Sequence, residues 1–417
     1  MISFDEAYKL TLQHIRALDV EIVDLMAADG YVAGEDFLAR ADSPSLDVSS
    51  KDGYAILSAD IQSASPESPV RLNLVGSVAA GGNWRGIVQS GEAVRILSGA
   101  PLPQGATAVV SEEFTQALPG AIQVINDSEP GRNVLHRGSD VQLGQRIVSA
   151  GQTLHPTTIG LLAAAGYQEV PVIRRPKVAI LATGDEVLAP GQPLVQGKLY
   201  ASNLFTLAAW CSHFGFRVET FILQDDTTCI RDVLAACPER FDAVLTSGGA
   251  WKGEHDLIVR ILDSLGWQKI YHRVRMGPGK AVGFGLFRDK PVFCLPGGPP
   301  SCHMAFIQLG LPGLQKLAGN SQLGLPEALA IMDKDIVSND PTWTQFIHGQ
   351  LVQENHRLLF HPIKYKSRLQ ELALAQAIAK IPEGQVELPA GSTVMVQVLG
   401  NPDHAWPLTG QHPFPPA

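Results

Sequence analysis

The chain has 417 residues, which is more than one hydrophobic core usually organises, so we expect two to four domains. Its hydrophobic content of 45% is ordinary for a globular protein. Its formal net charge is −9, and because nucleic acids and anionic membranes select basic surfaces, this charge disfavours both as partners.

The N-terminal segment is predicted to be helical. Ser3 and Glu6 have the spacing of a capping box, and apolar residues follow them at roughly helical intervals. The N-terminus lacks a basic segment followed by an apolar core, and the longest apolar stretch, 159–167, is too short to cross a bilayer. We therefore expect a cytoplasmic protein without a membrane partner.

Between residues 46 and 140 the pattern changes to short strands separated by turns. The candidate strands are 70–75, 93–97, 108–111 and 122–125. Because glycine and proline punctuate the sequence between them, we expect a β-rich module. A segment at 157–166 then has helical character.

The segment 177–301 is predicted to be the ligand-binding core. It contains four strand-like runs that each stop in a polar or glycine-rich turn: 177–181, 217–223, 242–245 and 292–295. Helix-like segments separate them at 203–214, 228–236 and 255–265. This alternation predicts an α/β domain with a parallel sheet that helices cover on both faces. In such sheets the ligand binds outside the carboxyl ends of the strands.

Acidic residues gather at this predicted edge of the sheet. They are Asp185, Glu186, Asp225, Asp226, Glu254 and Asp256. Six carboxylates at one edge would repel one another, and Mg²⁺, which prefers carboxylate oxygens and bridges to substrate phosphates, would relieve that repulsion. The alternative is that one or two of them are helix N-caps and the others are solvated.

Glycines and basic residues at the same edge suit an anionic ligand. Ser247-Gly-Gly249 permits close approach of the backbone, although a simple tight turn explains two glycines equally well. Arg273, Arg275 and Lys280 surround a second glycine-rich turn, and the alternative for them is an ordinary solvated charge run. Neither a P-loop nor a dinucleotide-binding fingerprint is present, and the histidines show no metal-ligand spacing.

After Gly319 the sequence regains β character. The candidate strands are 345–352, 358–361 and 392–399, with a helical interruption around 369–378. A small barrel or a sandwich would fit this pattern.

Five local motifs carry a family resemblance. They are Lys51-Asp-Gly-Tyr-Ala55, Ser98-Gly-Ala-Pro-Leu-Pro103, Thr183-Gly-Asp-Glu186, Ser247-Gly-Gly249 with Gly253-Glu254 and Asp256, and Pro278-Gly-Lys280 with Leu295-Pro-Gly297. In this order and spacing they resemble the molybdopterin molybdenumtransferase family, whose members insert molybdate into the pterin dithiolene cofactor.

The resemblance implies an elongated, L-shaped homodimer whose subunits have four domains. These are a helical domain (1–45 and 141–172), an inserted β-rich module (46–140), a molybdopterin-binding α/β domain (173–323) and a C-terminal β-barrel-like domain (324–417). It also implies an active cleft between the α/β domain of one subunit and the β-rich module of the other.

The resemblance further implies roles for individual residues. The catalytic residues would be Asp52, Asp140, Glu186, Asp225 and Asp256, of which Glu186, Asp225 and Asp256 would hold Mg²⁺. The substrate-binding residues would be Ser98, Thr183, Ser247, Gly248, Gly249, Lys252, Arg273, Lys280, Pro296, Gly297 and Ser367. Asp52, Ser98 and Asp140 would reach in from the partner subunit.

The implied reaction combines molybdate with adenylylated molybdopterin, in the presence of Mg²⁺, to give molybdenum cofactor and AMP. Enzymes that accept the finished cofactor would be further partners. Two alternatives stay open: a paralogue that inserts tungstate or handles a modified pterin, and a carrier or scaffold that binds the pterin cofactor without catalysis.

The chain departs from the family pattern in its substrate loops. Gly277 stands where the family commonly has Lys, Gly298 where it commonly has Asn, and His348 where it has an Arg. Ser367 is kept, but in a different local context. We hypothesise that Lys252 replaces the charge that is missing at Gly277, since both loops should open at the same edge of the sheet.

Overall fold

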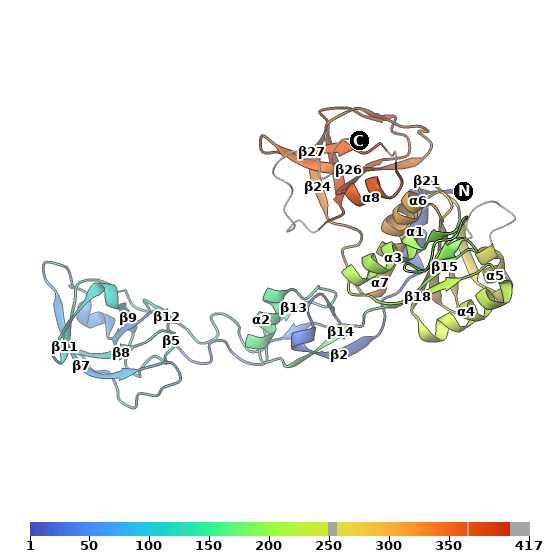
Figure 1. The fold of residues 1–417 in the computed structure, drawn as a ribbon. Helices are drawn as coiled ribbons and strands as arrows, with labels where there is room; N and C mark the ends of the chain where they lie inside the picture. The colour runs from blue at the N-terminus through green and yellow to red at the C-terminus, as the bar shows by residue number, and fades with distance from the viewer. Residues whose placement is uncertain (128, 249–256, 365–366, 401–417) are drawn as a thin grey trace. The chain divides into compact units, whose positions relative to one another are not determined.

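The computed structural model describes residues 1–127, 129–248, 257–364 and 367–400 (Figure 1). The chain forms two compact units, which are described separately. The first contains Met1–Glu21, Gly30–Val32 and Ile173–Ala417, and the second contains Ile22–Asp29 and Ala33–Val172. Within the described ranges, no helix is both long enough and apolar enough to cross a bilayer.

A six-stranded sheet forms the centre of the first unit. Its strands lie in the order β18 (Arg217–Leu223), β15 (Lys177–Thr183), β19 (Ala243–Ser247), β23 (Lys290–Leu295), β22 (Gly283–Phe287) and β20 (Gln268–His272). The first four are parallel, which confirms the parallel sheet predicted from their sequences. The last two are antiparallel additions at one edge that the alternating pattern did not predict.

Helices cover both faces of this sheet (Figure 1). Val178 and Ile180 of β15 pack in one core with α3 (Ser202–His213), and Ala179 and Leu181 pack in another with α4 (Thr227–Arg240) and α5 (Leu257–Leu265). Because successive side chains of a strand point to opposite faces, one continuous apolar run fills both cores. All turns at the carboxyl ends of the parallel strands are thereby brought to one edge.

A long helical segment follows β23. It consists of α6 (Pro299–Ala305), a π-helical turn at Phe306–Gly310 and α7 (Leu311–Leu317). It is buried along nearly its whole length and belongs to the same core as α3.

The C-terminal part is a closed barrel. Strands β26 (Thr344–Glu354), β27 (Arg357–Pro362), β24 (Glu327–Met332), β30 (Thr393–Val398) and β28 (Ala377–Ile381) pair in this order, and β28 pairs back with β26. The three predicted strands are confirmed. The helix predicted at 369–378 is partly wrong, because the helix α8 (Gln370–Leu374) ends early and β28 begins at Ala377. Two alanines in that strand, which favour helix intrinsically, concealed it.

The N-terminus joins this part of the fold. The helix α1 (Phe4–Gln13) begins where predicted, and the Glu6 backbone N–H donates to Ser3 Oγ at 3.2 Å. The short strand β1 (Ile2–Ser3) pairs in parallel with β21 (Val274–Gly277), which in turn pairs with β26. The Phe4 ring packs edge-on against Phe346 of β26, with ring centroids 5.0 Å apart.

The second unit is built around another six-stranded sheet. Its order is β10 (Thr115–Leu118), β11 (Ala121–Val124), β7 (Val70–Val78), β8 (Glu92–Ile96), β6 (Gly53–Ile56) and β9 (Ala108–Ser111). The four strands predicted for the β-rich module are confirmed, and the helix predicted at 157–166 is α2 (Pro156–Ala164). The remaining strands of the chain are short: β2 (Val20–Asp24), β3 (Val32–Ala33), β4 (Phe37–Leu38), β5 (Val48–Ser49), β12 (Val134–Leu135), β13 (Arg146–Val148), β14 (Glu169–Ile173), β16 (Val187–Leu188), β17 (Leu199–Tyr200), β25 (Ile336–Val337) and β29 (Glu387–Leu388).

Candidate functional site

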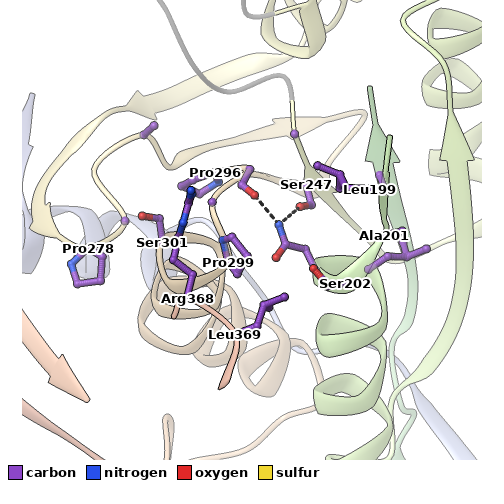
Figure 2. A pocket seen from close by; sticks show the side chains of 18 of the residues that line it. Leu199, Ala201, Ser202, Ser247, Pro278, Pro296, Pro299, Ser301, Arg368 and Leu369 are labelled. Atoms are coloured by element: carbon purple, nitrogen blue, oxygen red, sulfur yellow. Dashed lines mark hydrogen bonds between the residues drawn. The ribbon is translucent and has the colours of Figure 1, made fainter. Parts of the chain in front are cut away.

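A cavity of about 1010 Å³ opens at the carboxyl edge of the parallel sheet (Figure 2). Its lining includes Thr183 at the end of β15, Ser247 at the end of β19 and Pro296 just after β23. Trp343 and Arg368, from the C-terminal part, also line it. The cavity therefore lies at the edge of the sheet where the sequence predicts ligand binding. Its volume is at the upper end of the range that is typical of small-molecule sites.

Asn203, in the first turn of α3, ties two loops of this site together. Its Nδ2 donates to Ser247 Oγ at 3.0 Å and to the Gly297 carbonyl at 2.8 Å, the two dashed lines of Figure 2. The sequence marked Asn203 only as the start of a helix. Its role depends on β19 and β23 being neighbours, which a local pattern does not reveal.

The loops pack too closely for larger residues at one point. Gly248 has φ of +103°, and a Cβ there would lie 2.4 Å from the Thr183 carbonyl oxygen. Only glycine fits this position. Thr183 is 3% exposed, and its hydroxyl has no hydrogen-bond partner among the described residues.

Three carboxylates approach one another beside the cavity. Asp185 Oδ1 accepts a hydrogen bond from the Asp225 backbone N–H at 3.1 Å. Burial, then the negative charges of Asp185 and Glu186, raise the pKa of Asp225 above its ordinary value. Glu186 lines the cavity, whereas Asp225 is not among its lining residues. Burial is the larger cause of this shift, and the two neighbouring carboxylates add to it.

The three residues predicted to hold Mg²⁺, Glu186, Asp225 and Asp256, are not all among the described residues. Within them, no group of three or more His, Cys, Asp or Glu side chains is arranged to hold a metal ion. Asp256 and Glu254 lie outside the described residues. Asp226 caps α4 by accepting from the Cys229 backbone N–H at 2.8 Å, so the N-cap alternative is confirmed for that residue.

The predicted basic cluster is divided between three environments. Lys280 lines the cavity, and its Nζ lies 5.1 Å from the centroid of the Trp343 ring. Arg273 does not line the cavity; it has φ of +67°, and its backbone N–H donates to the Val282 carbonyl. Arg275 pairs with Glu383 at 2.8 Å and so attaches β21 to the C-terminal part. Lys252 and Gly249 lie outside the described residues.

Two further sequence predictions concern the C-terminal part. Ser367 does not line the cavity; its Oγ accepts from the Gln370 backbone N–H at 3.2 Å at the start of α8. His348, at the position where the resemblance expects an Arg, is buried, and its Nε2 lies 3.2 Å from Nδ1 of His303. Burial lowers the pKa of His348 to about 4, and burial together with His348 lowers the pKa of His303 to about 3. Both rings are therefore neutral near pH 7.

The remaining predicted residues belong to the second unit. Asp52 Oδ1 accepts a hydrogen bond from the Ser98 backbone N–H at 2.7 Å, so the structure brings these two residues together. Asp140 is exposed, and its backbone N–H donates to the Ser43 carbonyl at 2.9 Å. The catalytic roles of these residues stay predictions.

Comparisons with known proteins cover nearly the whole chain. Residues 2–166 match the MoeA N-terminal region (domain I and II), residues 179–316 a "probable molybdopterin binding domain", and residues 333–399 the MoeA C-terminal region (domain IV).

Relatives with curated names, and one with a crystal structure, match this chain over most of its length. A molybdopterin molybdenumtransferase of Nostoc is 31% identical over 91% of this chain and 89% of its own, and molybdopterin molybdenumtransferase 2 of Mycobacterium tuberculosis is 31% identical over 95% and 99%. The crystal structure of the molybdopterin biosynthesis MoeA protein from Pyrococcus horikoshii OT3 superposes with a TM-score of 0.82, at 28% identity, over 95% of this chain and 100% of that one. The chain belongs to the molybdopterin molybdenumtransferase (MoeA) family.

Proposed function

We propose that this protein is a molybdopterin molybdenumtransferase, which inserts molybdate into adenylylated molybdopterin and releases AMP. The observation that carries the proposal is the cavity at the sheet edge, which brings Glu186, Lys280 and the unpartnered Thr183 hydroxyl into one lining. Relatives that match nearly the full length of the chain carry this name.

The residues of the cavity suit the cleavage of a phosphoanhydride. That reaction needs positive charge near the leaving phosphate and fixed donors near the transferred oxygens. Lys280 provides the charge, and the hydroxyls of Thr183 and Ser247 provide polar contacts. A covalent nucleophile is not required.

Magnesium is part of the proposal. The carboxylates of Glu186 and Asp225, with Asp256, would hold Mg²⁺, which prefers carboxylate oxygens. When bound, Mg²⁺ would neutralise charge between phosphate oxygens.

We also propose a homodimer in which Asp52, Ser98 and Asp140 reach the cavity of the other subunit. The hydrogen bond between Asp52 and Ser98 supports their acting as one group. The four-domain division and delivery of cofactor to accepting enzymes belong to the same proposal.

AMP release tests the proposed function. The protein is incubated without oxygen with adenylylated molybdopterin, Mg²⁺ and either molybdate or tungstate. We expect AMP with molybdate, and Glu186→Gln should lower its rate of release about 100-fold, as loss of an electrostatic group in an active site does. Glu239→Gln, on the exposed surface of α4, is the matched control and should keep the wild-type rate.

The same experiment separates the alternatives. AMP with tungstate but not with molybdate would indicate the tungstate paralogue. Tight pterin binding without AMP from either oxyanion would contradict the transferase and favour a carrier.

A further inference from the structure

A second, smaller cavity of about 300 Å³ lies at the amino ends of the parallel strands, on the edge of the sheet opposite the cavity described above. We call it the amino-edge cavity. Its cationic lining residues come from the starts of β15, β18 and β23, from the segment before β15 and from the end of α4: Arg174, Arg175, Lys177, Arg217, Arg240 and Lys290. Its acidic lining residues are Glu21, Glu239 and Asp242. The excess of cations is local, because the whole chain has a formal net charge of −9.

The register of the sheet places several of these charges in one row. Lys177 of β15 is the register partner of Arg217 of β18. The registers of β15 with β19 and of β19 with β23 continue the row through Asp242 to Lys290. Side chains in one row across a parallel sheet point to the same face, and the strands that carry them are about 5 Å apart. The neighbouring cations Lys177 and Arg217 therefore repel each other.

A carboxylate of the protein already binds in this cluster. The Asp242 carboxylate accepts hydrogen bonds from both terminal nitrogens of Arg174 at 2.6 Å and from the Lys177 backbone N–H at 2.9 Å. Lys290 Nζ lies 3.5 Å from it. The donors at this edge are therefore arranged for an oxygen anion, but the single charge of Asp242 faces the cations of two side chains.

The other ion pairs leave positive charge in excess. The Glu219 carboxylate is shared between Lys177 and Arg240. Arg217 is exposed and makes no ion pair with any residue that the structure describes. Even when Arg175 is left aside and Glu21 is counted, the cations of this cluster exceed its acids by more than one charge. A multiply charged anion would neutralise this excess better than a singly charged one.

Arg175 adds a cation with a fixed position. Its guanidinium lies over the Tyr31 ring, 3.9 Å from the centroid. Gly215 provides the necessary space, because a Cβ there would lie 2.8 Å from Arg175 Cζ. A side chain that is held in this way loses little conformational entropy when it contacts a ligand.

The amino-edge cavity has the chemistry of a site for phosphate groups. Guanidinium groups present paired N–H donors that match two phosphate oxygens, and the ammonium of a lysine adds a point charge. A phosphate group carries about two negative charges near neutral pH, whereas a carboxylate carries one. The volume of about 300 Å³ is at the lower end of the range for small-molecule sites, so the ligand is small.

We propose that the amino-edge cavity is a second binding site, which takes a small phosphate-bearing anion through Arg175, Arg217 and Lys290. The anion is either free pyrophosphate or the phosphate end of a nucleotide. This site does not depend on the proposed transferase activity, because the loops of the candidate active site lie at the other edge of the sheet.

Calorimetric titration of the full-length protein with pyrophosphate tests the proposal, at constant ionic strength because salt screens exposed charges. Arg217→Ala should weaken binding about 10-fold, since it removes a charge-assisted contact. Arg217→Lys keeps the charge and should lose less. Arg71→Ala removes an exposed arginine of β7 that lines neither cavity, so it is the matched control and should bind as the wild type does.

Two further measurements locate the binding. Lys280→Ala, in the cavity at the carboxyl edge, should leave this binding event unchanged. Saturating pyrophosphate should slow amide hydrogen exchange in peptides that cover 174–180 and 214–219 in the wild type, and should do so less in Arg217→Ala. An unchanged thermal unfolding midpoint of Arg217→Ala without ligand would show that the lost affinity does not come from a disturbed fold.

The outcomes separate the ligands and decide the proposal. Tighter binding of ADP than of pyrophosphate, with the same dependence on Arg217, assigns the site to a nucleotide, and the opposite order assigns it to free pyrophosphate. Equal binding of pyrophosphate by the wild type and Arg217→Ala, or protection from exchange only at the carboxyl edge, would overturn the proposal. Binding of a hexaglutamate peptide without binding of pyrophosphate or ADP would also overturn it and would indicate an acidic protein segment as the partner.

Discussion

The hydrogen bond between His303 and His348 joins the helix that follows the Pro296 loop to strand β26 of the barrel. His303 is 5% exposed and His348 is 1% exposed, so charging either ring would place a cation in the core. The pair is therefore a polar contact between α6 and the barrel that requires both rings to be neutral.

This pair predicts a pH-dependent loss of stability. The folded-state pKa values of His303 and His348 are about 3 and about 4, below the ordinary value of 6.5. Between these values and 6.5 the two histidines bind protons in the unfolded chain but not in the folded chain. The free energy of unfolding should be insensitive to this pair above about pH 7 and should fall as the pH drops from about 6.5 toward about 4.

His348→Gln removes one of the two titrating groups. Thermal unfolding between about pH 7.5 and about pH 5 should then show a smaller decrease of the midpoint than in the wild type. His155→Gln, at an exposed position, should keep the wild-type decrease. Equal decreases in the wild type and His348→Gln would show that other groups control acid stability.

At the scale of single residues, sequence predicted those site residues that directly follow a strand. Thr183, Ser247, Gly248 and Pro296 line the cavity because each ends or follows a parallel strand. The sequence did not predict Asn203, Trp343 and Arg368 as residues of the site, because none of them follows a strand of the sheet. Asn203 lies at the start of α3, and Trp343 and Arg368 belong to the C-terminal part. Arg273, predicted to act beside Lys280, is not among the described lining residues, and its role in substrate binding stays a prediction.

At the scale of elements, strand β6 shows why its motif contains glycine. Gly53 pairs with Ser111 of β9, and a Cβ at Gly53 would lie 1.9 Å from the Val110 carbonyl oxygen. The glycine in Lys51-Asp-Gly-Tyr-Ala55 is therefore required by close backbone packing of β6 on β9. Asp52, which accepts from the Ser98 backbone N–H, directly precedes this strand.

Gly53→Ala should destabilise this sheet by about 3 kcal/mol, the cost of forcing a side chain into a fully packed position. Because a chain of several units does not unfold in one step, the local measurement is amide hydrogen exchange in β6 and β9, which should become faster. Gly160→Ala in α2 is the control: its Cβ meets nothing within 4 Å, and exchange there should stay the same or slow down. Unchanged exchange in β6 would mean that the sheet adjusts without cost.

The elements predicted well were those whose pattern is local and strong. Buried apolar runs marked the parallel strands, and the capping box marked α1. The antiparallel strands β20 and β22 were missed because the alternation of strands and helices does not extend to them, and the barrel strand β28 was misread because its alanines favour helix.

At the scale of the whole molecule, the proposed cross-subunit site predicts a result that only dimers of two different variants can show. If Asp52 serves the cavity of the partner, Asp52→Asn and Glu186→Gln should each abolish most AMP release by themselves. Unfolding and refolding them together, or expressing them together, should restore about one quarter of the wild-type rate, since half of the dimers carry one intact site of two. No recovery in a sample shown to contain mixed dimers would place Asp52 and Glu186 in the same subunit's site or outside it.

The pairing of β1 with β21 also sets an order of events during synthesis. The second unit contains a continuous stretch from Ala33 to Val172, so its sheet can close while the ribosome is still translating the first unit. Ile2, in contrast, has its strand partner in Val274. Ile2 and Ser3 thus leave the ribosome long before their partner strand does, and the pairing that precedes the Gly277–Lys280 loop forms only after β21 has been made.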